Sequence, residues 1–358
     1  MSRETIEWLN TMTLIGDTDK RGTAWHYRMG STNHYPGAIP MADVRGLLVP
    51  FEPQRREIYV RDRDTGEYVL LPDFIGVAPD NSPNAIYAVH SDGYAVHPFG
   101  MLSDTIEQLV DEDNLHVSSA GLLAKGSIAW VEVAIKEVMT VEGFAYRPHL
   151  LGSTSANGRY RTKFGRKCQA TVCDNTLDIA DREVGQSVEI SHTSGSMPRL
   201  KMIGEALGLI ESQAVAFDEE IRALTSWKVN PGLFSRWLDE MVPEKSKDGD
   251  LLTGAALTRA ERMREDMAQM WNADPRVSPW KDTALGILQL SNTRQHHNAR
   301  ITKATAHRVE RNMLNTISGK TESEDMRALG ILSGLSQAYG FTVPEKFEHI
   351  EIPQLATL

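Results

Sequence analysis

The chain has 358 residues, 41% of them apolar, and a formal net charge of −10. This is enough chain for one large domain or two ordinary ones with a real core, and its two cysteines are too few for a disulfide framework. The acidic balance argues against a generic polyanion binder, because phosphate contacts need clustered Lys and Arg. The start lacks a signal-peptide layout and no run approaches the roughly 18 apolar residues of a membrane span, so we expect a cytoplasmic protein with no membrane partner.

Residues 1–102 are predicted to be an N-terminal β-rich region. Eight prolines between positions 36 and 98 interrupt any longer period, so short strands and turns are favoured over helices. Two hairpins are predicted where apolar runs flank turn sequences such as Asp64-Thr65-Gly66. These hairpins join residues 58–60 with 68–71, and residues 87–89 with 94–96.

Residues 103–230 are predicted to be a central α+β core domain. Asp104 can cap a helix with Glu107 three residues later, and an apolar face follows it. After this helix come three runs typical of strands, and a loop of small residues at 152–158 separates the last two. Together they predict a three-stranded antiparallel meander at residues 127–138, 144–151 and 159–172.

Residues 231–358 are predicted to be a C-terminal helical region, after a helix that begins near Pro198 and continues to Trp227. The charged stretch 244–250 predicts an exposed linker, and helices are expected beyond it at residues 253–271, 283–317 and 328–339. The predicted class is therefore α+β: N-terminal hairpins, a helix and a three-stranded antiparallel β-meander, followed by a mainly helical C-terminal half.

Charge is distributed unevenly along the chain. Residues 143–173 carry six basic side chains and no acid, a balance of +6, whereas residues 205–289 carry 15 acids and 10 bases, a balance of −5. Residues 286–315 hold five bases against Glu310, a balance of +4. Two basic islands therefore lie in an acidic protein.

The first basic island has a spacing that phosphate binding can use. In a strand, Arg159, Arg161 and Lys163 have the same parity, so their side chains emerge from one face as a cationic stripe. Tyr160 and Phe164 interleave with this stripe, and cations beside aromatic rings are what sequence-tolerant single-strand binding uses. The alternative is a solvated sheet face whose charges pair with the acidic helices.

Motifs for catalysis, metals and cofactors are absent or weak. The chain contains no glycine-rich phosphate-binding motif and no HExxH pair, so we expect no cofactor, no metal and no catalytic residue. The enzyme alternative is a hydrolase or transferase that uses Cys173, His192 and His297.

Residues 166–177, Arg-Lys-Cys-Gln-Ala-Thr-Val-Cys-Asp-Asn-Thr-Leu, resemble the phage/plasmid-like family catalogued as domain of unknown function 932. The loop at 153–158 and the segment 190–193 also agree with that family, although Ser191 replaces its usual arginine. The resemblance covers most of residues 20–315 and implies a mobile-element origin without an enzyme activity. Other agreeing positions are Trp25, His26, Gly30, Tyr94, Ala120, Gly121, and His296 or His297.

The order of helix, meander and helix resembles the core of phage single-strand annealing proteins, which hold single-stranded DNA by its backbone as rings or filaments. The resulting hypothesis is a single-stranded DNA-binding and annealing protein of recombination or replication, a homo-oligomer in the host cytoplasm. A third alternative is a host-takeover protein that binds a partner through the Met-rich helix at 253–271. The predicted nucleic-acid-binding residues are Arg147, Arg159, Tyr160, Arg161, Lys163, Phe164, Arg166, Lys167, Arg300 and Lys303.

Overall fold

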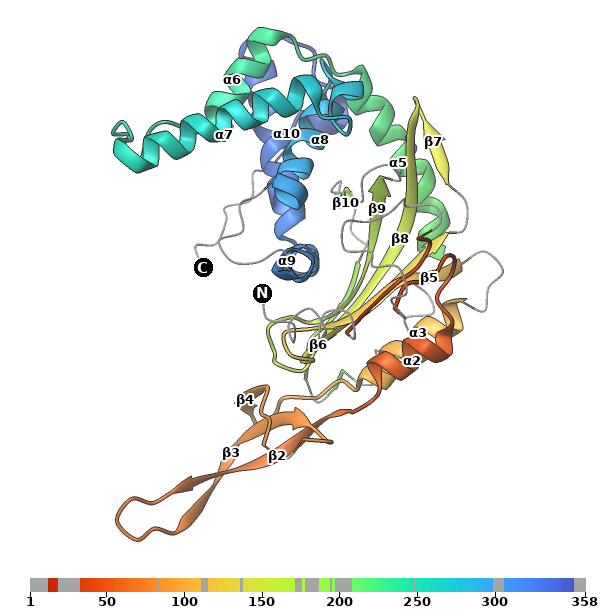
Figure 1. Cartoon of the computed structure of the whole chain (residues 1–358), viewed down its shortest axis with the longest axis vertical. Helices are drawn as coiled ribbons and strands as arrows, with labels where there is room; N and C mark the ends of the chain where they lie inside the picture. The colour runs from red at the N-terminus through yellow and green to blue at the C-terminus, as the bar shows by residue number, and fades with distance from the viewer. Residues whose placement is uncertain are drawn as a thin grey trace. The chain divides into compact units, whose positions relative to one another are not determined.

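A computed structural model describes most of the protein, which folds into two compact units (Figure 1). The first unit comprises Met1–Val138, Arg147–Lys167 and Glu183–Gln213, and the second comprises Met139–Tyr146, Cys168–Arg182 and Ala214–Leu358. The described residues are 12–18, 33–82, 84–110, 115–135, 138–170, 176–177, 187–193, 195–196, 208–246, 249–298 and 306–350.

An antiparallel sheet organises the first unit, although β7, β10, the first residues of β8 and the last residues of β9 are assigned to the second unit. Its strands follow the order β1-β5-β6-β8-β9; β11 and β10 also pair with β9, and β7 pairs with the start of β8. The predicted meander of three antiparallel strands is therefore confirmed as β6, β8 and β9. The strands are β1 (Thr13–Ile15), β5 (Leu115–Leu123), β6 (Ile128–Ile135), β7 (Met139–Val141), β8 (Phe144–Ser155), β9 (Thr162–Ala170), β10 (Thr176–Leu177) and β11 (Ser187–Ile190).

Helices α2 (Met41–Leu48) and α3 (Phe99–Val110) cover one face of this sheet (Figure 1). Alternate residues of β6, including Val131 and Val133, are buried in one apolar cluster with α3. The residues between them, such as Trp130 and Glu132, point to the other face by strand parity, and they are buried as well. Burial on both faces explains why the strand sequence shows a nearly continuous apolar run.

The start of α3 corrects a sequence prediction. The helix begins at Phe99, where the Glu52 carboxylate accepts hydrogen bonds from the Phe99 and Gly100 amides at 2.8 and 2.7 Å. Asp104 is therefore not the cap, because it lies inside the helix and forms an ion pair with Arg45 at 2.7 Å.

A second, three-stranded sheet consists of β2 (Pro53–Arg61), β3 (Tyr68–Pro79) and β4 (Ala88–Ser91). The first predicted hairpin is confirmed as β2 and β3, which Figure 1 shows as a long ribbon. The second predicted hairpin is wrong. Strand β4 pairs with the edge of β3, and Tyr94 instead forms a β-bridge with Thr193, far away in the sequence.

The second unit is mainly helical, as predicted. Helix α6 begins at Pro231, which is preorganised for a first turn, and the Asn230 side chain caps it by accepting from Leu233 N at 2.8 Å. Its helices are α5 (Gly208–Ser226), α6 (Pro231–Met241), α7 (Gly254–Ala273), α8 (Ala284–Thr293), α9 (Ala306–Ile317) and α10 (Lys320–Ala338).

Two expectations for this region change. The single helix predicted for 283–317 is wrong: α8 ends at Thr293, a π-helical turn follows at Arg294–Asn298, and α9 begins at Ala306. The Met-rich stripe of α7 packs inward, with Met267 and Met270 in the apolar core of the unit, so internal packing accounts for it. The three-region division at residues 102 and 230 stays a prediction.

Candidate functional site

The loop between β8 and β9 is held by one side-chain amide. Asn157 Oδ1 accepts hydrogen bonds from Ser155 Oγ at 2.9 Å and from Arg159 N at 3.1 Å. Asn157 Nδ2 donates to Ser127 Oγ, at 2.7 Å, in the turn between β5 and β6. An asparagine that bonds to nearby backbone and hydroxyl groups fixes a turn, so Arg159 starts from an ordered backbone.

A column of four stacked rings contacts the same loop at Gly158. Gly158 has φ +70°, and a Cβ on it would lie 2.2 Å from His90 Cε1, so glycine is required there. The His90 ring stacks on Tyr94 with centroids 3.9 Å apart, and Tyr94 stacks on His192 at 5.0 Å. His192 in turn stacks on His97 at 3.9 Å.

The buried end of this column is fixed by hydrogen bonds. His97 Nδ1 contacts Thr162 Oγ1 at 2.6 Å, and His97 Nε2 contacts Ser196 Oγ at 2.7 Å. Burial lowers the pKa of His97 to about 4 and raises the pKa of Tyr94 to about 12, while the Tyr94 hydroxyl donates to Ser155 O at 3.1 Å. The column is therefore an uncharged, rigid support at neutral pH.

Several cations lie on the segments joined to this support. Arg159 is exposed, and Arg161 and Lys163 lie 3.4 and 3.2 Å from the carboxylate oxygens of Glu189 on β11. Ala156 N donates to Ser127 O at 2.7 Å, which fixes the loop to the turn at 124–127 that carries exposed Lys125. We call Lys125, Arg159, Tyr160, Arg161 and Lys163 the loop surface.

The predicted cationic stripe is realised in part. Arg161 and Lys163 share a face, since both reach Glu189, whereas Arg159 lies in the loop before β9 begins. Tyr160 is half-buried beside them. Phe164 has the opposite parity and packs into the core with 2% exposure, so its ring is not available for stacking in this structure.

The remaining predicted residues are not on the loop surface. Arg147 is 5% exposed and forms a buried ion pair with Asp17; by strand parity it lies in β8 on the face opposite α2 and α3, the face on which Glu132 is also buried. Arg166 and Lys167 belong to β9, and their side chains lie outside the described part of the structure. The same holds for the whole of Arg300 and Lys303.

His192 and His297, two residues of the enzyme alternative, belong to different compact units. His192 belongs to the ring column, His297 to the π-helical turn, and Cys173 lies outside the described residues. Among the residues described, no group of three or more His, Cys, Asp or Glu could hold a metal ion. Within the same residues, no helix has the length and apolar character to cross a membrane.

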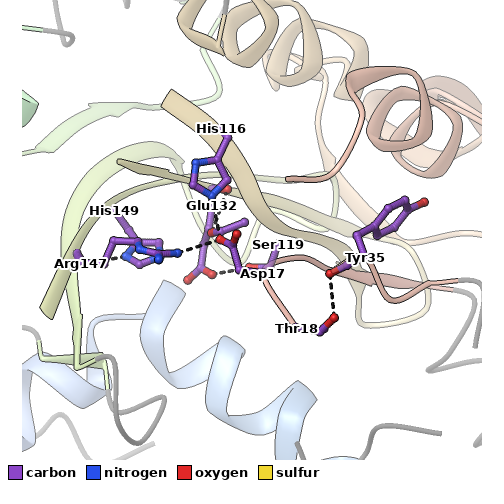
Figure 2. Close-up of polar contacts among 9 residues, drawn as sticks. Asp17, Thr18, Tyr35, His116, Ser119, Glu132, Arg147 and His149 are labelled. Carbon is purple, nitrogen blue, oxygen red and sulfur yellow. Dashed lines mark hydrogen bonds and ion pairs between the residues drawn. The ribbon is translucent and has the colours of Figure 1, made fainter. Parts of the chain in front are cut away.

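A buried polar cluster lies elsewhere in the first unit (Figure 2). Asp17 Oδ2 accepts from His116 Nε2 at 2.7 Å and from Arg147 Nη1 at 2.8 Å, with the carboxylate 3% exposed. Ser119 Oγ donates to the Glu132 carboxylate in the same view. These residues come from the β1 exit and from strands β5, β6 and β8, and sequence analysis did not connect them.

The missed residues carry weak sequence signals. Asp17 follows Gly16, a pair typical of a turn, and its backbone has φ +53°, which is uncommon outside glycine. His116 and Glu132 are single polar residues in apolar strands, so one sequence gives them no partner. Their strand neighbours become known only when the sheet register is known.

Comparison with known proteins identifies a family and nothing finer. The model of the family described as Domain of unknown function (DUF932) matches residues 87–316, and this range includes β5, β6, the loop surface and the whole ring column. No curated protein and no solved structure matches the chain. The chain therefore belongs to the DUF932 family.

Proposed function

We propose that this DUF932 protein binds single-stranded DNA at the loop surface and anneals complementary strands, as a phage- or plasmid-encoded protein of recombination or replication. The observation that carries the proposal is the charge of one rigid region. The segments 124–127, 156–163 and 187–193 hold four cations and one acid, Glu189. Such a local excess attracts phosphates even in a protein of net charge −10.

The ordered backbone supports binding as well as the charge does. A flexible loop loses conformational entropy when it closes on a ligand, whereas the Asn157 hydrogen bonds and the ring column already hold this loop. Half-buried Tyr160 lies beside the cations and offers a ring on which an unstacked base can pack. A duplex keeps its bases stacked, so the arrangement favours a single strand.

The direct test is a salt titration of oligonucleotide binding, run with single- and double-stranded DNA. Changing Arg161→Ala and Lys163→Ala together should weaken single-strand binding by about tenfold or more and lower the salt slope by about two, one for each lost phosphate contact. The matched control is Arg222→Ala with Lys228→Ala, which removes two exposed cations from the second unit. Equal slopes for wild type and the loop double variant would overturn the proposal.

Glu189 supplies a second test that loss of folding cannot imitate. Its carboxylate occupies Arg161 and Lys163 in the free protein and competes with a phosphate for both cations. Glu189→Gln should therefore bind single-stranded DNA more tightly than wild type, by several-fold at low salt. If the cations serve only to hold β11, the affinity stays unchanged or falls.

Annealing and assembly need separate measurements. The proposal includes a homo-oligomeric ring or filament, so light scattering should give a mass several times that of the chain when an oligonucleotide is present. Pairing of two complementary labelled strands should be faster with the protein than without it, and the loop double variant should remove this gain. Binding without faster pairing would leave a single-strand binding protein and exclude the annealing function.

A further inference from the structure

The polar cluster around Asp17 contains a guanidinium with only one of its edges in use. Arg147 Nη1 donates to Asp17 Oδ2 at 2.8 Å, and the side chain is 6% exposed. Its Nε and Nη2 atoms are also buried, and they have no hydrogen-bond partner in the described part of the protein. A guanidinium cannot lose its charge in a protein, so these buried donors remain charged and unsatisfied.

The position of the two free nitrogens indicates what would satisfy them. Nε and Nη2 form the side edge of the guanidinium, whose parallel N–H bonds match two oxygens of one carboxylate or phosphate group. The Asp17 carboxylate bonds to Nη1 and to His116 Nε2 through its Oδ2, and it makes no hydrogen bond to this edge. A buried His116 Nδ1 likewise has no partner among the residues the structure describes.

The surroundings hold Arg147 in place instead of letting it turn toward solvent. Asp17 lies in a left-handed backbone conformation, φ +53°, after Gly16, where a Cβ would lie 2.9 Å from Gly37 O. Non-glycine residues adopt this conformation at a cost, and such strain concentrates at functional sites. The carboxylate approaches both His116 and Arg147, which come from different strands (Figure 2).

From these contacts we propose that the Nε–Nη2 edge of Arg147 is a binding site for the oxyanion of a small molecule, a carboxylate or a phosphate group. The site is separate from the loop surface and does not depend on DNA binding. Ser119 and Glu132 belong to the same polar cluster, and the Ser119 hydroxyl donates to the Glu132 carboxylate (Figure 2). The alternative occupant of the edge is a buried water molecule.

The test measures thermal unfolding of the full chain with inorganic phosphate, acetate or chloride at one ionic strength. The unfolding temperature should be higher in phosphate or acetate than in chloride. The anion that raises it more shows whether the site prefers a phosphate or a carboxylate group. Arg147→Lys keeps the charge but loses the paired N–H edge. In this variant the rise of the unfolding temperature caused by phosphate or acetate should be at least tenfold smaller. The control Arg45→Lys, at an exposed ion pair, should keep the effect.

A second measurement on the wild-type chain covers the case in which Arg147→Lys does not fold. Native-state hydrogen exchange of the peptide around residues 144–150 should slow when phosphate or acetate is added and should not respond to chloride. No stabilisation and no slowed exchange would mean that water alone occupies the edge, and the site would be refuted. An equal stabilisation in Arg147→Lys would also refute it.

Discussion

Asp17→Asn tests how much the buried carboxylate contributes to the free energy of unfolding. Asparagine keeps the shape of the side chain and is among the residues that best tolerate a left-handed backbone, so the change removes the charge without adding strain at φ +53°. What remains is an Arg147 guanidinium, 6% exposed, without its counter-ion. Removing one partner of a buried ion pair costs about 3–5 kcal/mol.

The matched control is Asp104→Asn in the same unit. Asp104 and Arg45 lie 2.7 Å apart, close to the 2.8 Å between Asp17 and Arg147, but their side chains are 57% and 44% exposed. Solvent and salt screen such a pair, so its loss costs about 0–1 kcal/mol. The two substitutions are chemically identical and differ mainly in burial; in addition, Asp17 accepts from His116, and Arg45 keeps a second acidic partner in Glu107.

Equilibrium urea unfolding is the assay, with the midpoint and slope recorded for both variants. Asp17→Asn should lower the free energy of unfolding by several kcal/mol more than Asp104→Asn does. A difference below about 1 kcal/mol would refute the view that Asp17 compensates a buried cation. In that case, water would already solvate the Arg147 charge, or a bound anion would already neutralise it.

Three further changes give distinct expected results. Phe164→Ala should lower the free energy of unfolding by about 3–5 kcal/mol, because the ring is 2% exposed in the core, whereas Tyr160→Ala should weaken single-strand binding with little change in the urea midpoint. Gly158→Ala should displace the loop, since a Cβ would lie 2.2 Å from His90 Cε1; the double variant with His90→Ala should recover part of the lost DNA affinity, and no recovery would contradict the contact. His97 has a pKa of about 4 when folded and an ordinary value of 6.5 when unfolded, so its stabilising contribution is present above pH 6.5 and is lost as the pH falls toward 4. His97→Asn should flatten part of the resulting pH slope of the urea midpoint, and part should remain because burial also lowers the pKa of His296 to about 4.

Sequence patterns predict those elements that are stabilised by contacts between residues close together in the sequence. The hairpin of β2 and β3 follows from an Asp-rich turn in which Asp62 Oδ1 accepts from Asp64 N at 2.9 Å and from Thr65 N at 2.8 Å. The meander follows from apolar runs separated by turns. Strand β5 was missed because its sequence, Leu-His-Val-Ser-Ser-Ala-Gly-Leu-Leu, alternates poorly, and a register shift between Val117 and Ser119 breaks its period.

Features that depend on contacts between residues far apart in the sequence could not be predicted. Glu52 caps α3 from 47 residues away, so the nearer Asp104 was chosen. The ring column joins His90, Tyr94 and His97 to His192 only because the β-bridge between Tyr94 and Thr193 brings the two segments together. Arg147 was assigned to a surface from its charge, although the sheet places it beside Asp17, which lies 130 residues away in the sequence.

The acidic net charge and the proposed DNA site are compatible because they act over different distances. At physiological salt the Debye length is about 8 Å, so a bound phosphate interacts mainly with the loop surface and with Glu189. At low salt the net charge of −10 acts over a longer distance and slows the approach of DNA. We therefore infer that lowering the salt tightens binding mainly by slowing dissociation, unlike a uniformly basic protein, in which lower salt also strongly accelerates association.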